Sequence, residues 1–513
     1  MKSKNLACVV TAAIITLATT TRLSAQEDHN GGEDQNSKKG ETYRKEHHRY
    51  KLVDLGTLGG PKSYLNGGGG PRYPSRSILS RSGEVAAAGD TGIPDLIDPG
   101  CPPCLVVHAF DWDHGVQTNL GALPAHAATG PNVLCLDCAW VSWIYSISDT
   151  GTIVGQSENG QIDPLTGAPA FLAVSWRAGK VINLGTGTLG GNESTAGAVN
   201  RQGDIVGAAL NRTVDPFPGR CPYCDFFVFG NGTEPHAVLW RDGKMRDLGT
   251  LGGPDSAAFF VNDDGQVAGA SDVDYGFYKT IENPGGGPSV HPFLVKEGKM
   301  LDLVENAPTG MFGGSYGIAT WLNNRGQVTG TMNLAGDTTW HSFLWDHGTL
   351  TDLGTLGGAN TTSAWLSETG HAVGKSDVAE ICGACAPGDQ KQLHHPFVWK
   401  DGAIQDLGLL PGDTAGSAYS INRHDQIVGR SLPCAQINPD DSCDGPHYHA
   451  FLWENGSLAD LQSLVVPGAA INVDEADEIN DQGEIAGTGT LSNGDRHVVL
   501  LIPCDPDHDI RDR

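Results

Sequence analysis

Short runs of alternating apolar and polar residues, separated by turns, repeat along most of the 513-residue chain. The stretch His236–Ser271 contains the whole pattern, HAVLWRDGKMRDLGTLGGPDSAAFFVNDDGQVAGAS. It divides into four runs with the length and composition of β-strands, bounded by Gly, Asn or Asp. His341–Ser376 and His395–Ser431 follow the same order of runs. The pattern therefore predicts an all-β protein built from four-stranded units.

The number of four-stranded units follows from two motifs, each of which occurs once per unit. The D-L motif or its N-L variant occurs eight times, at Asp54, Asn119, Asn183, Asp247, Asp302, Asp352, Asp406 and Asp460. The H-x-F-L-W type of run also begins eight times, at His108, Leu172, His236, His291, His341, His395, His449 and His497. The first D-L run, Tyr50–Gly56, has no partner before it, and the last H-x-F run, His497–Ile502, has none after it. We therefore predict one closed β-propeller of eight four-stranded blades over residues 50–504, clasped by these two end runs. An open β-solenoid would explain the repeats but not the complementary ends.

The two faces of such a disc differ in sequence. If the strands of a blade are named A to D from the channel to the rim, H-x-F-L-W is strand C and D-L-G is strand D. The A–B turns, such as Asn262–Gly265, are short and rich in Gly, Asn and Asp, with little to hold a partner. Long insertions fall in the B–C and D–A connections, such as Asn211–Pro235. We expect any ligand on the face with the insertions, because binding sites concentrate on variable loops held by a rigid scaffold.

The ends of the chain have a different character from the repeats. Residues 1–25 resemble a secretory signal peptide, with Lys2 and Lys4 ahead of an apolar run that is short for a membrane span. Residues 26–49 are polar and predict a disordered linker, and residues 505–513 predict a polar tail. We therefore expect a protein that is secreted, to the periplasm or the extracellular space, after cleavage near Ala25.

The composition is strongly acidic. The formal net charge is −27, and removal of the three basic residues of the leader makes it −30. An acidic surface repels nucleic acids and anionic membranes. We expect a monomer without a further membrane span that binds a protein or a glycan, and no nucleic acid.

Ten of the twelve cysteines form five close pairs within the insertions. The pairs are Cys101 and Cys104, Cys135 and Cys138, Cys221 and Cys224, Cys382 and Cys385, and Cys434 and Cys443. In an oxidising compartment such pairs predict local disulfide bonds that brace the loops. A redox site at Cys221–Cys224, or zinc held by two neighbouring pairs, is the alternative. Cys504 is left over.

The recurring histidines and aspartates predict structure and not catalysis. Because one histidine recurs in each blade, neighbouring copies would lie too far apart to share a metal ion. In a C–D hairpin, His236 comes opposite Asp247, which predicts a structural hydrogen bond. The same role is predicted for His108, His291, His341, His395, His449 and His497 and for Asp54, Asp302, Asp352, Asp406 and Asp460.

No motif identifies a catalytic, cofactor-binding or metal-binding residue. The chain has no G-x-S-x-G and no H-E-x-x-H, and no helix follows the T-L-G-G loops to make them a phosphate cradle. Calcium is conceivable where acidic residues gather in or near the insertions, but their spacing is not that of an EF-hand. These residues are Asp272, Asp274, Asp440, Asp441 and Asp444.

The combined motif resembles one known family. H-[ASP]-F-x-W, D-L-G-T-L-G-G and I-N-x-x-G-x-V-x-G, as in His449–Trp453, Asp352–Gly358 and Ile421–Gly429, are similar to the repeats of the HAF family of extracellular bacterial proteins. In Ile421–Gly429, Asp425 replaces the first glycine. The resemblance implies export and a repeat array, but no chemistry. We therefore expect a binding scaffold that uses the face with the disulfide-braced loops. The alternative is a propeller enzyme, of glycosidase or lyase type, acting on an extracellular polymer.

Overall fold

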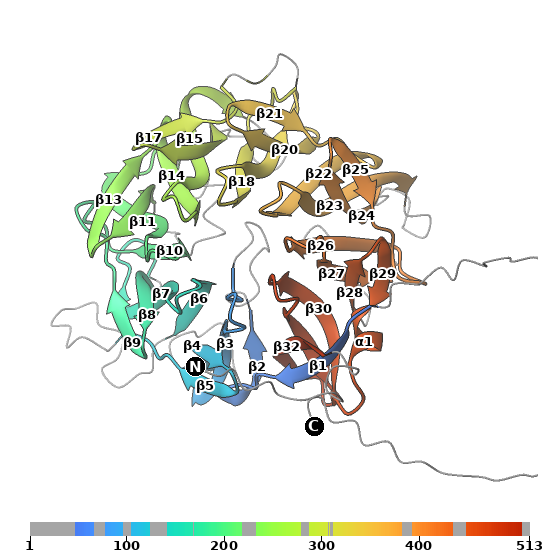
Figure 1. The fold of residues 1–513 in the computed structure, drawn as a ribbon. Helices are drawn as coiled ribbons and strands as arrows, with labels where there is room; N and C mark the ends of the chain where they lie inside the picture. The colour runs from blue at the N-terminus through green and yellow to red at the C-terminus, as the bar shows by residue number, and fades with distance from the viewer. Residues whose placement is uncertain are drawn as a thin grey trace, which may run out of the picture.

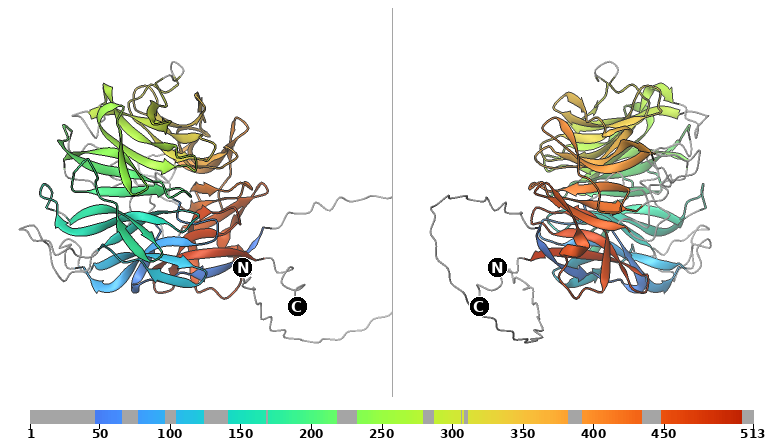
Figure 2. Two further views of the ribbon diagram at one scale, coloured as in Figure 1. Left: turned by 60° about the vertical axis from the view of Figure 1, so that its left-hand side comes forward. Right: turned by 90° about the vertical axis from the view of Figure 1, so that its right-hand side faces the viewer.

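Eight four-stranded antiparallel sheets stand around a central channel in the computed structural model, which confirms the eight-bladed propeller (Figure 1). The structure describes residues 47–65, 77–95, 104–123, 141–167, 169–217, 232–278, 287–305, 307, 311–381, 392–433 and 448–504. Figure 2 shows the disc from two further directions, with each sheet twisting on its way from the channel to the rim. Within the described residues the helical content is a single turn, α1 (Leu461–Leu464).

The strands of the first four blades follow in chain order. Their bounds, from strand A to strand D, are β2 (Gly59–Tyr64), β3 (Val85–Pro94), β4 (Leu105–Asp113) and β5 (Val116–Asn119) for blade 1; β6 (Ser142–Ile147), β7 (Ile153–Ile162), β8 (Pro169–Arg177) and β9 (Lys180–Asn183) for blade 2; β10 (Ser194–Val199), β11 (Ile205–Val214), β12 (Thr233–Arg241) and β13 (Lys244–Gly249) for blade 3; and β14 (Gly252–Val261), β15 (Val267–Tyr278), β16 (Gly287–Lys296) and β17 (Lys299–Asp302) for blade 4.

The remaining blades repeat the order, except that blade 8 takes its last strand from the start of the chain. Their bounds are β18 (Gly317–Leu322), β19 (Val328–Asn333), β20 (Trp340–Asp346) and β21 (Thr349–Asp352) for blade 5; β22 (Gly357–Leu366), β23 (Ala372–Ile381), β24 (Gln392–Lys400) and β25 (Ala403–Asp406) for blade 6; β26 (Ala415–Ile421), β27 (Ile427–Leu432), β28 (His449–Glu454) and β29 (Ser457–Asp460) for blade 7; and β30 (Ile471–Ile479), β31 (Ile485–Leu491), β32 (Arg496–Cys504) and β1 (Arg49–Asp54) for blade 8.

The ring closes where the two ends of the repeat array meet. β1 pairs antiparallel with β32, with Leu52 opposite Leu501 and Asp54 opposite Val499. This pairing completes blade 8 and removes the exposed edges that an open array would leave. β1 starts at Arg49, and His48 just before it donates its backbone N–H to Glu454 of blade 7.

The core lies between neighbouring blades and is filled by the apolar positions of the repeat. The phenylalanine of H-x-F-x-W is fully buried wherever it occurs, at Phe110, Phe293, Phe343, Phe397 and Phe451. Among the tryptophans that close strand C, Trp176 and Trp240 are 1% and 3% exposed. Large flat side chains at these positions bury much apolar area against the next sheet, which explains their recurrence.

A β-bulge interrupts strand A at the same place in blades 2 to 8. In each, one residue of strand A has no partner on strand B, as at Tyr145 in blade 2 and Phe259 in blade 4. The bulge lies close to the glycine of Q-V-x-G on strand B. A Cβ on Gly207 would lie 1.9 Å from the carbonyl oxygen of Thr195, a distance that no side chain can accept. Bulges re-aim the side chains that follow them, and here those side chains lie along the channel.

Candidate functional site

The channel widens into a cavity of about 210 Å³ at the face formed by the A–B turns. All eight blades contribute to its lining, through the ends of their A strands and the first residues of their A–B turns. This is the face on which the sequence predicted little to hold a partner. The second residue of each turn is nevertheless charged or carries an amide, so this face also offers polar groups to a ligand.

These second residues form what we call the mouth ring. In order of blades they are Arg81, Asp149, Arg201, Asp263, Asn324, Glu368, Arg423 and Asp481. The ring therefore carries three guanidinium groups, four carboxyl groups and one amide.

Hydrogen bonds between blades fix the geometry of the mouth ring. The backbone N–H of Arg201 donates to the Asp263 carboxylate at 3.1 Å, and that of Asp263 donates to Asn324 Oδ1 at 2.8 Å. The N–H of Asn324 reaches the Glu368 carboxylate at 3.2 Å. Each acceptor belongs to the next blade around the channel. These acceptor side chains line the mouth and thus also hold neighbouring turns together, because each accepts a hydrogen bond from the turn before it.

The first residue of the A–B turn adds a second set of links. Where this residue is asparagine, its side-chain N–H donates to the backbone carbonyl of the same position in the next blade, as from Asn262 to Asn323 at 3.1 Å. The link between Asn480 and Ser80, also 3.1 Å, joins blade 8 to blade 1. The asparagine that recurs at the end of strand A is therefore structural.

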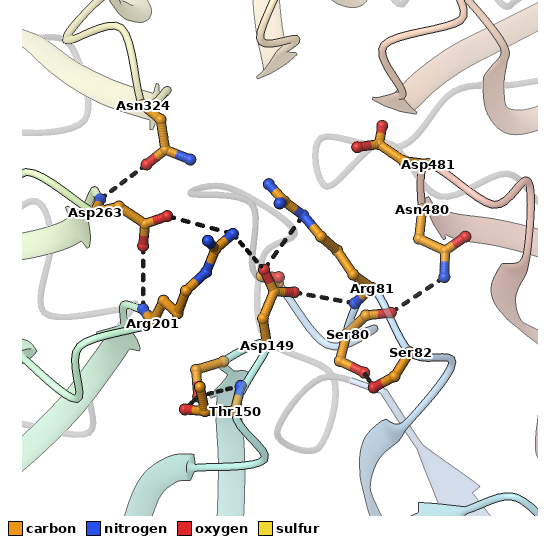
Figure 3. Close-up of polar contacts among 12 residues, drawn as sticks. Ser80, Arg81, Ser82, Asp149, Thr150, Arg201, Asp263, Asn324, Asn480 and Asp481 are labelled. Atoms are coloured by element: carbon orange, nitrogen blue, oxygen red, sulfur yellow. Dashed lines mark hydrogen bonds and ion pairs between the residues drawn. The ribbon is translucent and has the colours of Figure 1, made fainter. Parts of the chain in front are cut away.

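Asp149 is the centre of the charged contacts at the mouth. It accepts the backbone N–H of Arg81 at 3.0 Å and lies 3.2 Å from Arg81 Nε and 3.3 Å from Arg201 Nη2. Figure 3 shows both guanidinium groups extending from their own blades toward Asp149. The two arginine side chains are about half exposed, at 48% and 46%, whereas Asp149 is 26% exposed. The arginines can therefore donate further hydrogen bonds to a ligand.

Below the mouth ring the channel wall is asymmetric. The residue two places before each A–B turn is aromatic in blades 4, 5 and 6, at Phe260, Trp321 and Trp365, but small in blades 2 and 3, at Ser146 and Ala198. Trp321 and Trp365 stack with ring centroids 3.5 Å apart, and Phe260 lies 5.1 Å from Trp321. The small side chains of the neighbouring blades 2 and 3 leave space beside this aromatic wall.

Two carboxyl groups border the cavity, one buried and one exposed. The buried Glu478 accepts hydrogen bonds from the backbone of Ile78 at 2.6 Å and Leu79 at 3.0 Å, which fastens blade 8 to blade 1. Burial raises the pKa of Glu478 to about 8, although these hydrogen bonds act against the shift. The side chain of Glu368 is exposed at the mouth; partial desolvation raises its pKa, and the nearby carboxylates of Asp263 and Asp481 add to that effect.

The histidine–aspartate pairs predicted from the sequence lie away from this cavity, along the C–D hairpins. Nδ1 of His236, His291, His341 and His395 lies 2.7–3.1 Å from the carboxylate of Asp247, Asp302, Asp352 and Asp406 respectively. His497 contacts Asp54 at 2.9 Å across the closure, and His108 contacts Asn119 at 3.1 Å. In most of these hairpins the aspartate also accepts the N–H of the following glycine, as from Gly249 at 2.8 Å.

Blade 7 departs from this pattern. His449 contacts Asp413 at 3.0 Å and not Asp460, so the predicted pairing is wrong there. Asp460 precedes α1, and its side chain accepts the N–H of Gln462 at the helix start, as the other D-L aspartates accept the N–H two residues on. The position after D-L holds glycine in most blades, but it is Gln462 here and Val304 in blade 4, where His291 still contacts Asp302.

Of the ten cysteines in the predicted pairs, the described residues include only Cys104. Cys104 precedes β4 and accepts the N–H of Asp95 through its carbonyl oxygen. The other candidates, Cys101, Cys135, Cys138, Cys221, Cys224, Cys382, Cys385, Cys434 and Cys443, lie outside the described residues. The disulfide pairings therefore stay predictions, and so does the signal peptide, which lies before residue 47.

The acidic residues considered for calcium do not form a metal site in the part of the chain that the structure describes. Asp272 is buried in blade 4, and its charge, with burial, raises the pKa of Asp255 to about 9. Asp440, Asp441 and Asp444 and the side chain of Asp274 lie outside the described residues. Among the helices of the described residues, none has the length and apolar character needed to span a membrane.

No family model matches this chain. No curated protein matches it either. Among solved structures, dipeptidyl peptidase 4 of Porphyromonas gingivalis is 9% identical, with a TM-score of 0.40 over 83% of this chain and 59% of that one. The sialidase of Trypanosoma rangeli is 10% identical, with a TM-score of 0.30 over 70% of this chain and 53% of that one. An ulvan lyase is 11% identical, with a TM-score of 0.31 over 89% and 96%. This chain thus spans little more than half of the first two proteins. Likeness of this kind says nothing about activity.

Proposed function

We propose that the protein is an exported binding module that takes the end of a carbohydrate chain into the channel mouth at the A–B turns. One observation carries the proposal. The cavity combines an aromatic wall, small residues in the neighbouring blades 2 and 3, and a ring of hydrogen-bonding side chains above both. Pockets that bind small ligands combine apolar walls with a few placed polar groups in this way.

The size of the cavity favours a single sugar unit. Pockets for drug-sized ligands have about 300–1,000 Å³. The cavity of about 210 Å³ is smaller, so it suits one ring of a longer chain whose remainder stays outside. The apolar face of a sugar ring packs against aromatic side chains such as Trp321 and Trp365, which gain apolar contact.

The mouth ring offers the matching polar chemistry. A hydroxyl group both donates and accepts a hydrogen bond. Around the ring, donors on Arg81 and Arg201 alternate with acceptors on Asp149 and Asp263. Because backbone hydrogen bonds between blades already hold the acceptors, the ring is ordered before the ligand arrives, and less entropy is lost on binding.

The face with the insertions is a second proposed binding surface for a partner. Most of those loops lie outside the described residues, so the proposal that they contact a ligand rests on the sequence alone. The HAF resemblance and export rest on the sequence in the same way.

A second function, hydrolysis or lysis of the bound polymer, is favoured by the environments of two carboxyl groups at the mouth. Partial desolvation raises the pKa of Glu368, whose side chain is exposed at the mouth, while Asp149 is held by two arginines. Carboxyl groups in contrasting environments can divide the roles of acid and base. Release of new chain ends from a bound polymer, abolished in E368Q, would show catalysis. Binding without such release would leave the protein as a module that only binds.

The binding proposal is tested with a glycan array and calorimetry on residues 26–513, comparing the wild type with two variants. A198W fills the small side of the cavity and should lower glycan affinity at least about tenfold, by excluding the sugar ring. A403W places the same side chain on the exposed outer strand of blade 6 and should bind as the wild type does. If A198W folds and binds every captured glycan normally, the cavity is not the site.

A further inference from the structure

We infer that the mouth selects a sugar with a carboxylate group, such as a uronate at the end of a glycan, and that Arg81 and Arg201 bind that carboxylate. This inference rests on the binding function proposed above. It adds the class of ligand and the residues that recognise it.

The two arginines have donors left over. A guanidinium group carries five N–H bonds in a fixed plane. Asp149 uses Nε of Arg81 and Nη2 of Arg201. Within the described residues, the two terminal nitrogens of Arg81 and Nη1 of Arg201 have no other hydrogen-bond partner. With Nε turned to Asp149, the terminal nitrogens of Arg81 can form the two parallel bonds that a carboxylate accepts.

The charges of the mouth ring are divided between its two sides. Blades 1 to 3 supply two guanidinium groups and one carboxylate, from Arg81, Asp149 and Arg201. The five positions of blades 4 to 8 supply one guanidinium group and three carboxyl groups. In a chain with a formal net charge of −27, the side formed by blades 1 to 3 is thus a local site for an anion.

The channel wall gives the ligand its orientation. The aromatic side chains Phe260, Trp321 and Trp365 lie in blades 4 to 6. Ser146 and Ala198 lie in blades 2 and 3, on the side of the channel that carries Arg201 and Asp149. A sugar ring that packs on the aromatic wall therefore directs its other side across the open space toward the guanidinium groups. A carboxylate on that side reaches the donors described above.

Calorimetry with matched sugars tests the inference. The probes are uronate-terminated oligosaccharides, the same oligosaccharides after reduction of the carboxyl group to the neutral sugar, and free glucuronate. We expect the wild type to bind the acidic form roughly tenfold more tightly than the reduced form, because a hydrogen bond to a charged group contributes about that much to affinity. Glucuronate binding as tightly as the oligosaccharide would show that the free acid suffices, and weaker binding would show that the chain contributes.

Four variants separate recognition from folding. R81A and R201A should lower the affinity for the acidic form to that of the reduced form, whereas R246A, an exposed arginine on β13, should change neither. D149N keeps both guanidinium groups, removes the competing charge and should bind the acidic form more tightly than the wild type. Equal affinity of the wild type for acidic and reduced sugars would overturn the inference and leave the proposed function standing. No binding of either sugar by the folded wild type would overturn both.

Discussion

The glycine of Q-V-x-G is an example of a residue whose role depends on a close backbone approach. Trp143, Thr195 and Ser417 direct their carbonyl oxygens at Gly155, Gly207 and Gly429, where a Cβ would lie 1.9–2.0 Å away. Blade 1 has Ala87 at this position, and residues 66–76 before its A–B turn lie outside the described residues. The glycine is thus needed where the carbonyl oxygen of strand A approaches this closely, as it does in blades 2 to 8.

G207A tests this account of the glycine. The added methyl group meets backbone atoms and no flexible side chain, so the bulge must shift. We expect a loss of about 1–3 kcal/mol in the free energy of unfolding, measured by chemical denaturation. A87G in blade 1 removes no such clash and should change stability by less. Unchanged stability of G207A would contradict the assigned role.

Glu478 should make the stability of the ring depend on pH. Its folded pKa of about 8 lies above its ordinary value of 4.5, so the folded state binds the proton more tightly. The stabilisation is complete below pH 4.5 and is lost as the pH rises through about 8. His394, whose pKa burial lowers to about 3, opposes this effect only below its ordinary value of 6.5.

E478Q isolates that contribution. Glutamine resembles the protonated acid, so the melting temperature of the variant should equal that of the wild type near pH 6.5. Between pH 6.5 and 9 the melting temperature of the variant should fall by less than that of the wild type. Equal pH dependence in the two proteins would show that Glu478 is not protonated in the folded ring.

At the scale of single residues, the sequence predicted most of the structural His–Asp contacts but did not predict the mouth ring. The spacing of His236 and Asp247 predicts a contact, because a hairpin turn fixes which residues face each other. The mouth ring has no such signal, since Arg81, Asp149 and Glu368 share only their place in a turn. Comparing the second turn residue of every blade would have found it.

At the scale of elements, the C–D hairpin was predicted closely and its exception was not. In the D-L-G turn the aspartate accepts the N–H two residues on, from glycine in most blades and from Val304 in blade 4. In blade 7 the chain forms α1 after Asp460, and His449 contacts Asp413 in place of Asp460. Because Val304 leaves the contact between His291 and Asp302 intact, loss of the glycine alone does not produce this exception.

The insertions between strands B and C, together with the one between strand D of blade 1 and strand A of blade 2, supply a prediction of their own. We expect five local disulfide bonds, since each cysteine pair is close in sequence and the leader predicts an oxidising compartment. Peptide mapping without reduction should find Cys101 linked to Cys104 and Cys221 to Cys224. A link between Cys101 and Cys135, or stoichiometric zinc in the purified protein, would contradict this arrangement.

At the scale of the whole molecule, stability should depend on the closure between β1 and β32. Deleting residues 497–513 removes strand C of blade 8 and leaves β1 without a partner. Because each blade packs on two neighbours, we expect a large fall in melting temperature for the entire ring. Deleting residues 505–513 alone keeps β32 and should change little. Equal melting of the two truncated proteins would contradict closure.

The closed ring could be predicted because the chain itself contains the evidence. An unpaired strand at Tyr50–Gly56 and its missing partner at His497–Ile502 require each other, and the structure pairs them. The proposed site at the A–B turns could not be predicted from loop length. Its cavity is lined by Trp321 and Trp365 together with Ser146 and Ala198, and only the closed ring brings these blades around one channel.

Hydrogen–deuterium exchange, with and without a saturating uronate-terminated oligosaccharide, tests most directly whether the channel mouth binds the ligand. We expect the ligand to slow exchange in the A–B turns at residues 80–84, 148–152 and 200–204, and at the ends of β18 and β22 that carry Trp321 and Trp365. Protection confined to the insertions, such as residues 211–235, with the A–B turns unchanged, would contradict the account and return the site to the opposite face.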